Sequence, residues 1–212
     1  MIYAENIFIC IVIPLLLSLL FVRGESRRFV VSLLCGMLAC LLAAYISGFL
    51  SMTGGMSSED AAIFLSPMVE EMLKFFPLLL YLLLMRPSDR ELLIVGVGVG
   101  VGFATFENCC ALLSGGASQI SYVLVRGLSA GVMHIVSIAT LTMGLILARR
   151  LRALSTAGIL GALSLSVVFH GLYNLLVSEA GVTLWIGYAM PLASAVLLFI
   201  LYRLLRDKPE VQ

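Results

Sequence analysis

The chain has 212 residues, of which 61% are hydrophobic and only 12% are charged, and its formal net charge is +1. This composition is typical of a polytopic membrane protein and excludes an ordinary soluble domain. Proteins that bind nucleic acids carry a strongly basic face, whereas the arginines here stand at the ends of apolar runs, so we expect no nucleic-acid partner. The expected fold class is all-α, a bundle of transmembrane helices surrounded by a lipid bilayer.

Seven apolar runs follow one another along the chain, each close to the ~20 residues that a membrane-spanning helix needs. They are 7–22, 29–52, 61–85, 92–114, 121–148, 156–178 and 182–205. The loops between them are too short to hold a soluble domain, so we expect residues 1–212 to form a single integral membrane domain. The first run lacks the basic n-region and the clear cleavage site of a signal peptide, which favours a retained helix.

Basic residues alternate from one loop to the next. Loops one, three and five and the C-terminal end carry every Lys and Arg except Lys74 and Arg126, whereas the N-terminal end and loops two, four and six carry none. This pattern predicts an N-out, C-in multi-pass protein of the cell (inner) membrane. The residues concerned are Arg23, Arg27, Arg28, Arg86, Arg90, Arg149, Arg150, Arg152, Arg203, Arg206 and Lys208.

The third run contains three charged residues within five positions, Glu70, Glu71 and Lys74. Each charge at the centre of a bilayer costs about 2.5 to 3.5 kcal/mol on insertion scales, so these groups need partners. On a helix, Glu70 faces Lys74 at i, i+4 and Glu71 reaches it at i, i+3. Because one lysine cannot neutralise two acids, we expect the other carboxylate to meet a polar group of another helix. The simpler alternative is an ion pair that only locks this helix.

The fourth run begins with a glycine pattern between Gly96 and Gly102. It matches neither the dinucleotide fingerprint nor a Walker A loop. It contains two overlapping G-x-x-x-G pairs, Gly96 with Gly100 and Gly98 with Gly102, which predict close approach of a neighbouring helix.

Strongly polar residues inside the runs are confined to four consecutive runs. They are Glu70, Glu71 and Lys74 in the third, Glu107 and Asn108 in the fourth, Arg126 and His134 in the fifth, and His170 and Asn174 in the sixth. At 1.5 Å per residue, the acids and both histidines lie roughly 10 to 20 Å from the outer helix ends and can share one layer. We expect Arg126 to reach headgroups or to pair with an acid, Asn108 to bridge helices, and the other three runs to form a scaffold.

Carboxylates, imidazoles and an amide in one layer suit the activation of water. A glutamate can accept a proton from water that histidine and asparagine position, while an imidazole or amide stabilises the oxyanion at a peptide carbonyl. The same set suits zinc, with His134, His170 and one glutamate as ligands and water as the fourth. No H-E-x-x-H motif is present, so a glutamate-dependent and a zinc-dependent mechanism both stay open.

Taken in order, these motifs resemble those of the PrsW family of intramembrane proteases, which is related to the CAAX-processing and bacteriocin-processing glutamate proteases and, more distantly, to the Aph subunit of gamma-secretase. In the CAAX branch a histidine stands where this chain has Glu107. The residues that carry the resemblance are Glu70-Glu71-x-x-Lys74, Phe103-x-x-x-Glu107-Asn108, His134 and His170-Gly171-Leu172-Tyr173-Asn174.

The resemblance implies a protease that cleaves a membrane-tethered protein, as better-known members cleave an anti-sigma factor on its extracytoplasmic side. It implies Glu70 or Glu71 as the water-activating base and Glu107 as a second carboxylate. The implied positioning and oxyanion groups are His134, His170 and Asn174, with Lys74, Phe103 and Asn108 in support. Because the Aph subunit does no chemistry, the alternative is a scaffold or a transporter of protons or small solutes that uses the same polar groups.

Overall fold

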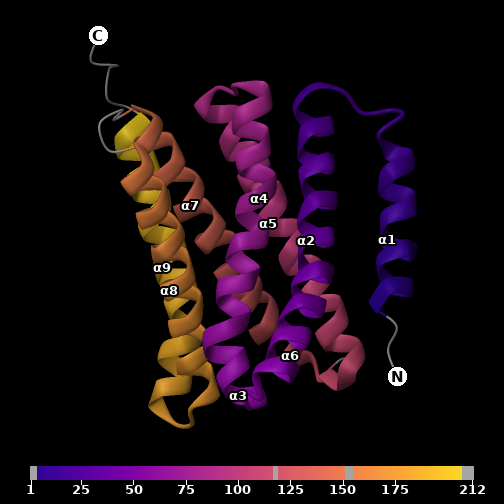
Figure 1. The fold of residues 1–212 in the computed structure, drawn as a ribbon, viewed down its shortest axis with the longest axis vertical. Coiled ribbons are helices and arrows are strands. Elements are labelled where there is room, and N and C mark those ends of the chain that lie inside the picture. The colour runs from indigo at the N-terminus through magenta and orange to yellow at the C-terminus, as the bar shows by residue number, and fades with distance from the viewer. Residues whose placement is uncertain (1–3, 117–118, 151–154, 207–212) are drawn as a thin grey trace.

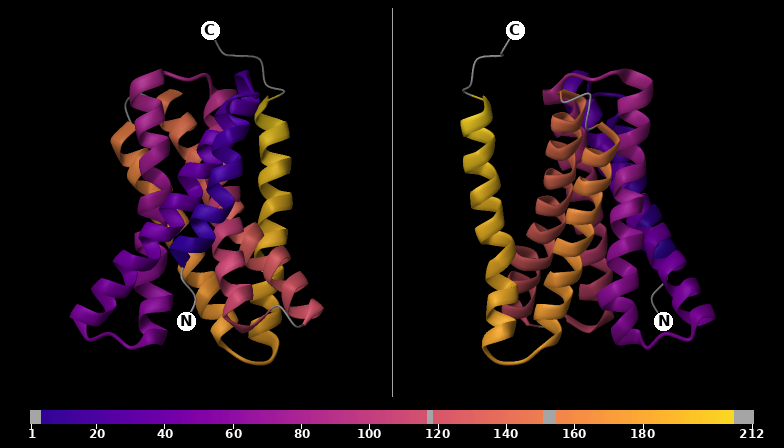
Figure 2. Two further views of the ribbon diagram at one scale, coloured as in Figure 1. Left: turned by 90° about the vertical axis from the view of Figure 1, so that its right-hand side faces the viewer. Right: turned by 60° about the vertical axis from the view of Figure 1, so that its left-hand side comes forward.

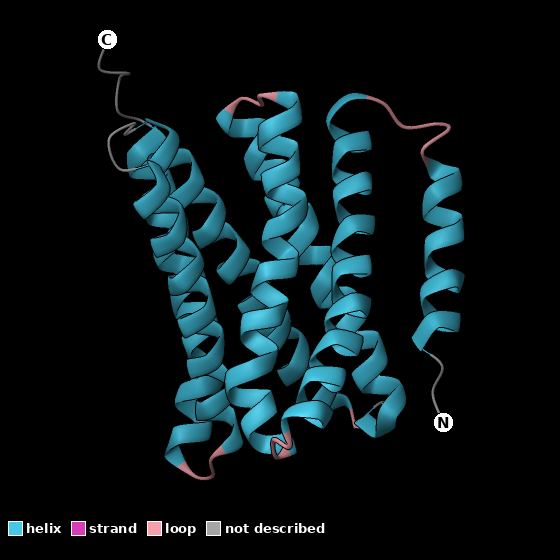
Figure 3. Ribbon diagram, viewed as in Figure 1, coloured by secondary structure: helices cyan, strands magenta, loops and turns pink. Residues whose placement is uncertain are grey.

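The computed structural model describes residues 4–116, 119–150 and 155–206. These residues are helical apart from short connections, and no strand occurs among them (Figure 3). The expected all-α fold is therefore confirmed for this part of the chain. Arg152 and Lys208, which contribute to the topology prediction, lie outside the described residues.

The helices follow one another with short loops, and three of them are interrupted or extended by wider π-helical turns, labelled η (Figure 1). The elements are α1 (Ala4–Ser18), α2 (Gly24–Gly54), α3 (Ser58–Asp60), η1 (Ala61–Leu65), α4 (Ser66–Met85), α5 (Asp89–Ala111), η2 (Leu112–Gly116), α6 (Ile120–Arg126), η3 (Gly127–Gly131), α7 (Val132–Arg150), α8 (Ser155–Ser178) and α9 (Val182–Arg206).

Five helical stretches within the described residues are long and apolar enough to cross a membrane, which makes the chain a multi-pass membrane protein. They are Gly24–Gly54, Asp89–Gly115, Ile120–Arg150, Thr156–Ser178 and Val182–Leu201. The seven expected spans also include α4 and α1, which are not among these five stretches. Helix α4 has 20 residues but contains three charged side chains, and α1 has only 15 residues.

The two ends of the bundle differ in charge. In Figure 1, α2 and α5 begin, and α7 and α9 end, at the upper end of the bundle. Ion pairs join α2, α5 and α7 there: Arg28 and Arg90 pair with Glu91 and Glu25 at 2.9 and 3.1 Å, and Asp89 pairs with both arginines that end α7. Four of the arginines that the sequence places on one side of the membrane, Arg28, Arg90, Arg149 and Arg150, therefore lie at one end of the bundle.

Close packing around α5 depends on its glycines. Gly98 and Gly102 face α2, and a Cβ at Gly102 would overlap the backbone of Leu33. Gly96 and Gly100 face α7, and a Cβ at either position would overlap an α7 side chain. The predicted close approach is confirmed, with the addition that each G-x-x-x-G pair serves a different neighbouring helix.

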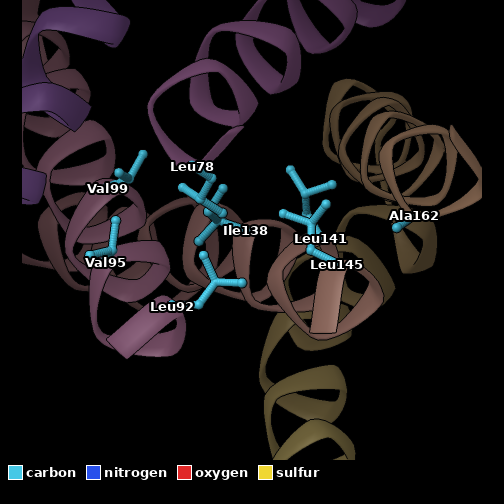
Figure 4. Packing of buried hydrophobic residues seen from close by; sticks show 8 residues of the cluster. All are labelled: Leu78, Leu92, Val95, Val99, Ile138, Leu141, Leu145 and Ala162. Carbon is cyan, nitrogen blue, oxygen red and sulfur yellow. The ribbon is translucent and has the colours of Figure 1, made fainter. Parts of the chain in front are cut away.

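An apolar cluster joins the four helices that carry the polar motifs (Figure 4). It packs one turn beyond the polar residues of α4 and α7, and it contains Leu78 of α4, Leu92, Val95 and Val99 of α5, Ile138, Leu141 and Leu145 of α7, and Ala162 of α8. Since all of these side chains are buried, the cluster fixes the rotation and depth of the four helices, and with them the directions of the polar side chains.

Candidate active site

The innermost polar residues are Glu71 and Lys74 of α4, whose side chains are both 0% exposed. Lys74 Nζ donates to Glu71 Oε1 over 2.5 Å, and the Ser137 hydroxyl on α7 lies 3.0 and 3.1 Å from the two Glu71 oxygens. Lys74 therefore pairs with Glu71, and the other carboxylate of the prediction is that of Glu70, which faces His170 of another helix at 3.7 Å. Every oxygen of the Glu71 carboxylate is engaged, so this group is fixed in place and shielded from water.

His170 of α8 is oriented by that same carboxylate. Its Nδ1 lies 2.8 Å from Glu71 Oε1, while its Nε2 faces Glu70 Oε2 at 3.7 Å. Because an ionised carboxylate only accepts hydrogen bonds, the contact assigns the ring proton to Nδ1. The basic nitrogen, Nε2, is then directed toward Glu70.

His134 of α7 lies between Lys74 and Glu107. Its Nδ1 is 3.1 Å from Lys74 Nζ, and its Nε2 makes a short hydrogen bond with Glu107 Oε2. Its ring packs edge-on against the His170 ring, with centroids 5.1 Å apart, and lies 4.9 Å from the ring of Phe103. Lys74 Nζ also sits 4.7 Å above the centre of the Phe103 ring, a cation–π distance that helps to hold the buried ammonium.

Glu107 of α5 is fixed from its other side by Arg126. Arg126 Nη2 donates to Glu107 Oε1 over 2.7 Å, which is one of the two placements expected for this arginine. The Glu107 side chain is 33% exposed, so it remains accessible where Glu71 is not. Asn108 packs beside Gly131 of η3, where a Cβ would come within 3.2 Å of its amide nitrogen, and so lies at a helix contact.

Asn174 has a different environment from the histidines. Its Nδ2 donates over 2.9 Å to the carbonyl oxygen of Ala62 in η1, and the contact is exposed. One turn earlier on α8, Gly171 lets the helix approach the Ile63 carbonyl, from which a Cβ would be 3.1 Å away. Asn174 therefore joins α8 to the widened turn that precedes Pro67.

Glu70, His134 and His170 form a possible metal-binding group. Each offers one ligand atom, and these atoms all lie within 4.8 Å of one another. Glu70 Oε2 is buried and, among the described residues, has no hydrogen-bond partner. Two imidazoles and one carboxylate are the ligands of a common type of catalytic zinc site, and the Glu71 contact to His170 is the usual outer-shell support. The residues present therefore fit a divalent cation.

A cavity of about 340 Å³ opens beside this group. Its walls come from α2 and from the segment α3, η1 and α4, and its inner end is formed by Glu70, Phe103 and Glu107. Figure 2 shows the end of α2 and the segment α3–η1 diverging from the other helices. The second run, expected to serve as a scaffold, forms one wall of this cavity.

Sequence reasoning missed two kinds of residue. Ser137, one turn after His134, completes the contacts of Glu71, but a serine in an apolar helix is too common to be a signal. The α2 wall has a weak signal, since Cys40, Ala44 and Gly48 recur at a spacing of four and so expose small side chains on one face.

Comparisons with known proteins agree with this geometry. A family model described as PrsW family intramembrane metalloprotease matches residues 25–204, which include all of the polar residues above. No match to a curated protein or to a solved structure was found. We conclude that the chain belongs to the PrsW family and is an intramembrane protease, a membrane-embedded hydrolase of peptide bonds.

Proposed function

We propose that the chain cleaves a membrane-tethered protein at the cavity between α2 and α4, with Glu70, His134 and His170 as ligands of one catalytic zinc ion. The observation that carries the proposal is that Glu70 belongs both to a group with His134 and His170, whose ligand atoms lie within 4.8 Å of one another, and to the lining of the cavity, which it shares with Glu107. When bound, the cation supplies positive charge that polarises a carbonyl oxygen and favours ionisation of water.

Glu107 is the proposed acceptor of the proton from water. It lines the cavity and is partly exposed, and Arg126 fixes its other oxygen. To hold the cation, His134 would act as a neutral imidazole ligand through Nε2, so its hydrogen bond to Glu107 Oε2 would be absent and that carboxylate would be available to accept a proton from water. The water oxygen bonds to the peptide carbon, the C–N bond breaks, and Glu107 returns the proton to the leaving amine.

Glu71 and Lys74 are proposed as positioning residues. The carboxylate of Glu71 is fully buried, contacts Lys74, Ser137 and His170, and is not among the residues that line the cavity. Its proposed role is to hold His170 with Nε2 toward Glu70. The family resemblance implies Glu70 or Glu71 as the water-activating base. In this proposal Glu70 is instead a metal ligand and Glu71 a positioning residue.

The membrane topology and substrate type are part of the proposal. We propose seven spans with the N-terminus outside, because the basic loop residues gather at the end of the bundle opposite the cavity. The cavity then lies in the outer half of the bilayer. This placement and the motif resemblance favour a substrate of the anti-sigma-factor kind, cleaved near its extracytoplasmic side.

The test uses purified protein in proteoliposomes with a set of single-span reporter proteins, and mass spectrometry of the new termini. We expect cleavage that a chelator abolishes and added zinc restores, and loss of cleavage in Glu70→Gln and His134→Ala. Glu59→Gln, an exposed acid on α3, is the matched control and should cleave normally. Cleavage that persists in the chelator, or in both site variants, would contradict the proposal.

A further inference from the structure

The cavity contains a polar group that the proposed chemistry does not use. Ser47 of α2 is only 8% exposed, and its hydroxyl has no hydrogen-bond partner among the described residues. A helical serine usually satisfies its hydroxyl on the carbonyl one turn back. A buried hydroxyl without a partner costs free energy, so its presence on the cavity wall indicates a ligand that supplies the partner.

A second polar atom without a hydrogen-bond partner lies in the same cavity. Glu70 Oε2, at the inner end, is also buried and also lacks a partner within the described part of the chain. Besides Ser47, the α2 wall of the cavity contains the small residues Cys40, Ala43, Ala44 and Gly48. The cavity is thus a passage with a polar wall group, an uncharged lining and the reacting groups at its end.

The Ser47 hydroxyl, unpartnered within the described residues, favours one conformation of a bound polypeptide. A helical segment bonds its backbone N–H and C=O groups to one another and leaves none of them for a group on the wall. An extended backbone, by contrast, is thin and leaves its N–H and C=O groups free for a hydrogen bond from Ser47.

We propose that this cavity is the subsite for the substrate chain on one side of the scissile bond, which it takes as an unwound, extended segment with uncharged side chains. Ser47 hydrogen-bonds a backbone group of that segment. The carboxylates of Glu70 and Glu107 at the inner end disfavour acidic side chains next to the cleaved bond. This inference rests on the proposed function, because it assigns the path by which the substrate reaches the same site.

Gly48 offers a direct way to close the passage. It lines the cavity, and a Cβ there would meet nothing within 4 Å, so a larger side chain fits without disturbing the fold. Gly48→Leu should lower kcat/KM for a cleaved reporter by about tenfold or more. Ser47→Ala should raise KM about fivefold with little change in kcat, the effect of one lost hydrogen bond. Leu42→Phe adds bulk on the exposed side of α2 and is the control that should change neither value.

A disulfide-trapping measurement tests binding without catalysis. Ser51, on the cavity wall, is replaced by cysteine in a Glu107→Gln chain whose native cysteines are alanine, and a single cysteine is moved along an uncleaved single-span reporter. We expect cross-linking at positions flanking the cleavage site, and loss of the cross-link when Gly48→Leu is added. Zinc content and thermal stability of each variant report whether the site and the fold are intact.

The outcomes separate the two proposals. If the wild-type chain cleaves the reporter but Gly48→Leu cleaves equally well and no cross-link forms at position 51, the subsite is overturned and the protease function stands. If cross-links form but the wild-type chain cleaves nothing, the proposed function fails while the binding path stands. Absence of both cleavage and cross-links overturns both.

Discussion

The same four helices form two regions of opposite character. Toward the basic end of the bundle, α4, α5, α7 and α8 meet in an apolar cluster, and toward the other end they meet in a network of acids, imidazoles and an ammonium. Only one helical turn separates the regions: Lys74 is followed by Leu78, and His134 by Ile138. The comparison shows how charges can be kept inside a membrane protein, since the apolar region supplies the packing that holds the polar region in register.

The two regions respond differently to the loss of a side chain. In the apolar cluster each residue contributes by dispersion contacts, so its loss leaves a void and a local cost. In the polar region each group neutralises another, so removal of one leaves its partner charged and unpaired in a low-dielectric environment. This difference can be measured with single substitutions in each region.

The largest expected effect is on catalysis. His170→Ala removes one proposed ligand, the same imidazole that donates a hydrogen bond to Glu71, so peptide hydrolysis should fall to background, a loss of about 10³-fold or more. Hydrolysis is measured with a cleaved reporter in proteoliposomes. A folded His170→Ala variant with more than a tenth of wild-type kcat would show that the polar region is structural.

The next effect concerns stability. Lys74→Met leaves the buried Glu71 without its cation and should destabilise the protein by roughly 3–5 kcal/mol in denaturant unfolding. Adding Glu71→Gln should recover most of this loss, because the double variant has no unpaired charge. Arg90→Ala, which breaks an exposed pair with Glu25, should cost no more than about 1 kcal/mol. If the double variant were as unstable as Lys74→Met, the cost would not come from an unpaired charge.

A smaller effect on activity is expected in the apolar region. Leu141→Ala leaves a void among fully buried residues and should destabilise the fold by about 2–5 kcal/mol. Its folded fraction should retain kcat within a few-fold of the wild type, because it contacts none of the proposed catalytic groups. Unfolding and hydrolysis are measured on the same preparation, and a kcat loss as large as that of His170→Ala would erase the distinction between the regions.

The smallest effect is expected at Asn174. Its amide bonds the carbonyl of Ala62, so Asn174→Ala should cost about 0.6 kcal/mol, the average for such interhelical bonds, and should lower kcat by only a few-fold. If Asn174 were the oxyanion donor that the family resemblance implies, kcat would fall by about 10²- to 10³-fold. The measured kcat therefore decides between the two roles.

Much of the fold could be predicted because membranes impose simple rules. Length and hydropathy located the helices, and the glycine spacing predicted close packing around α5. The polar residues could be located because charges are rare in such helices, so Glu71 and Lys74 stood out without any structural information.

The other features of the site depend on how each helix is rotated about its axis and on the volume left open between helices. A short stretch of sequence does not determine either of these. Glu70 and Glu71 are neighbours about 100° apart on one helix, so the sequence alone could not decide which faces the cavity. Asn174 shares a face with His170, but the widened turn η1 brings it a carbonyl partner of its own. The α2 wall of the cavity is made of small residues, whose contribution is the volume they leave open.

The central claim is that Glu70, His134 and His170 together bind a catalytic metal ion at the inner end of the cavity. Elemental analysis of the purified chain, run beside the hydrolysis assay, tests it most directly. We expect one zinc ion per wild-type and Asn174→Ala chain, and none in Glu70→Gln or His170→Ala. A wild-type protein that hydrolyses its reporter without bound metal, or site variants that keep a full complement of zinc, would contradict the claim.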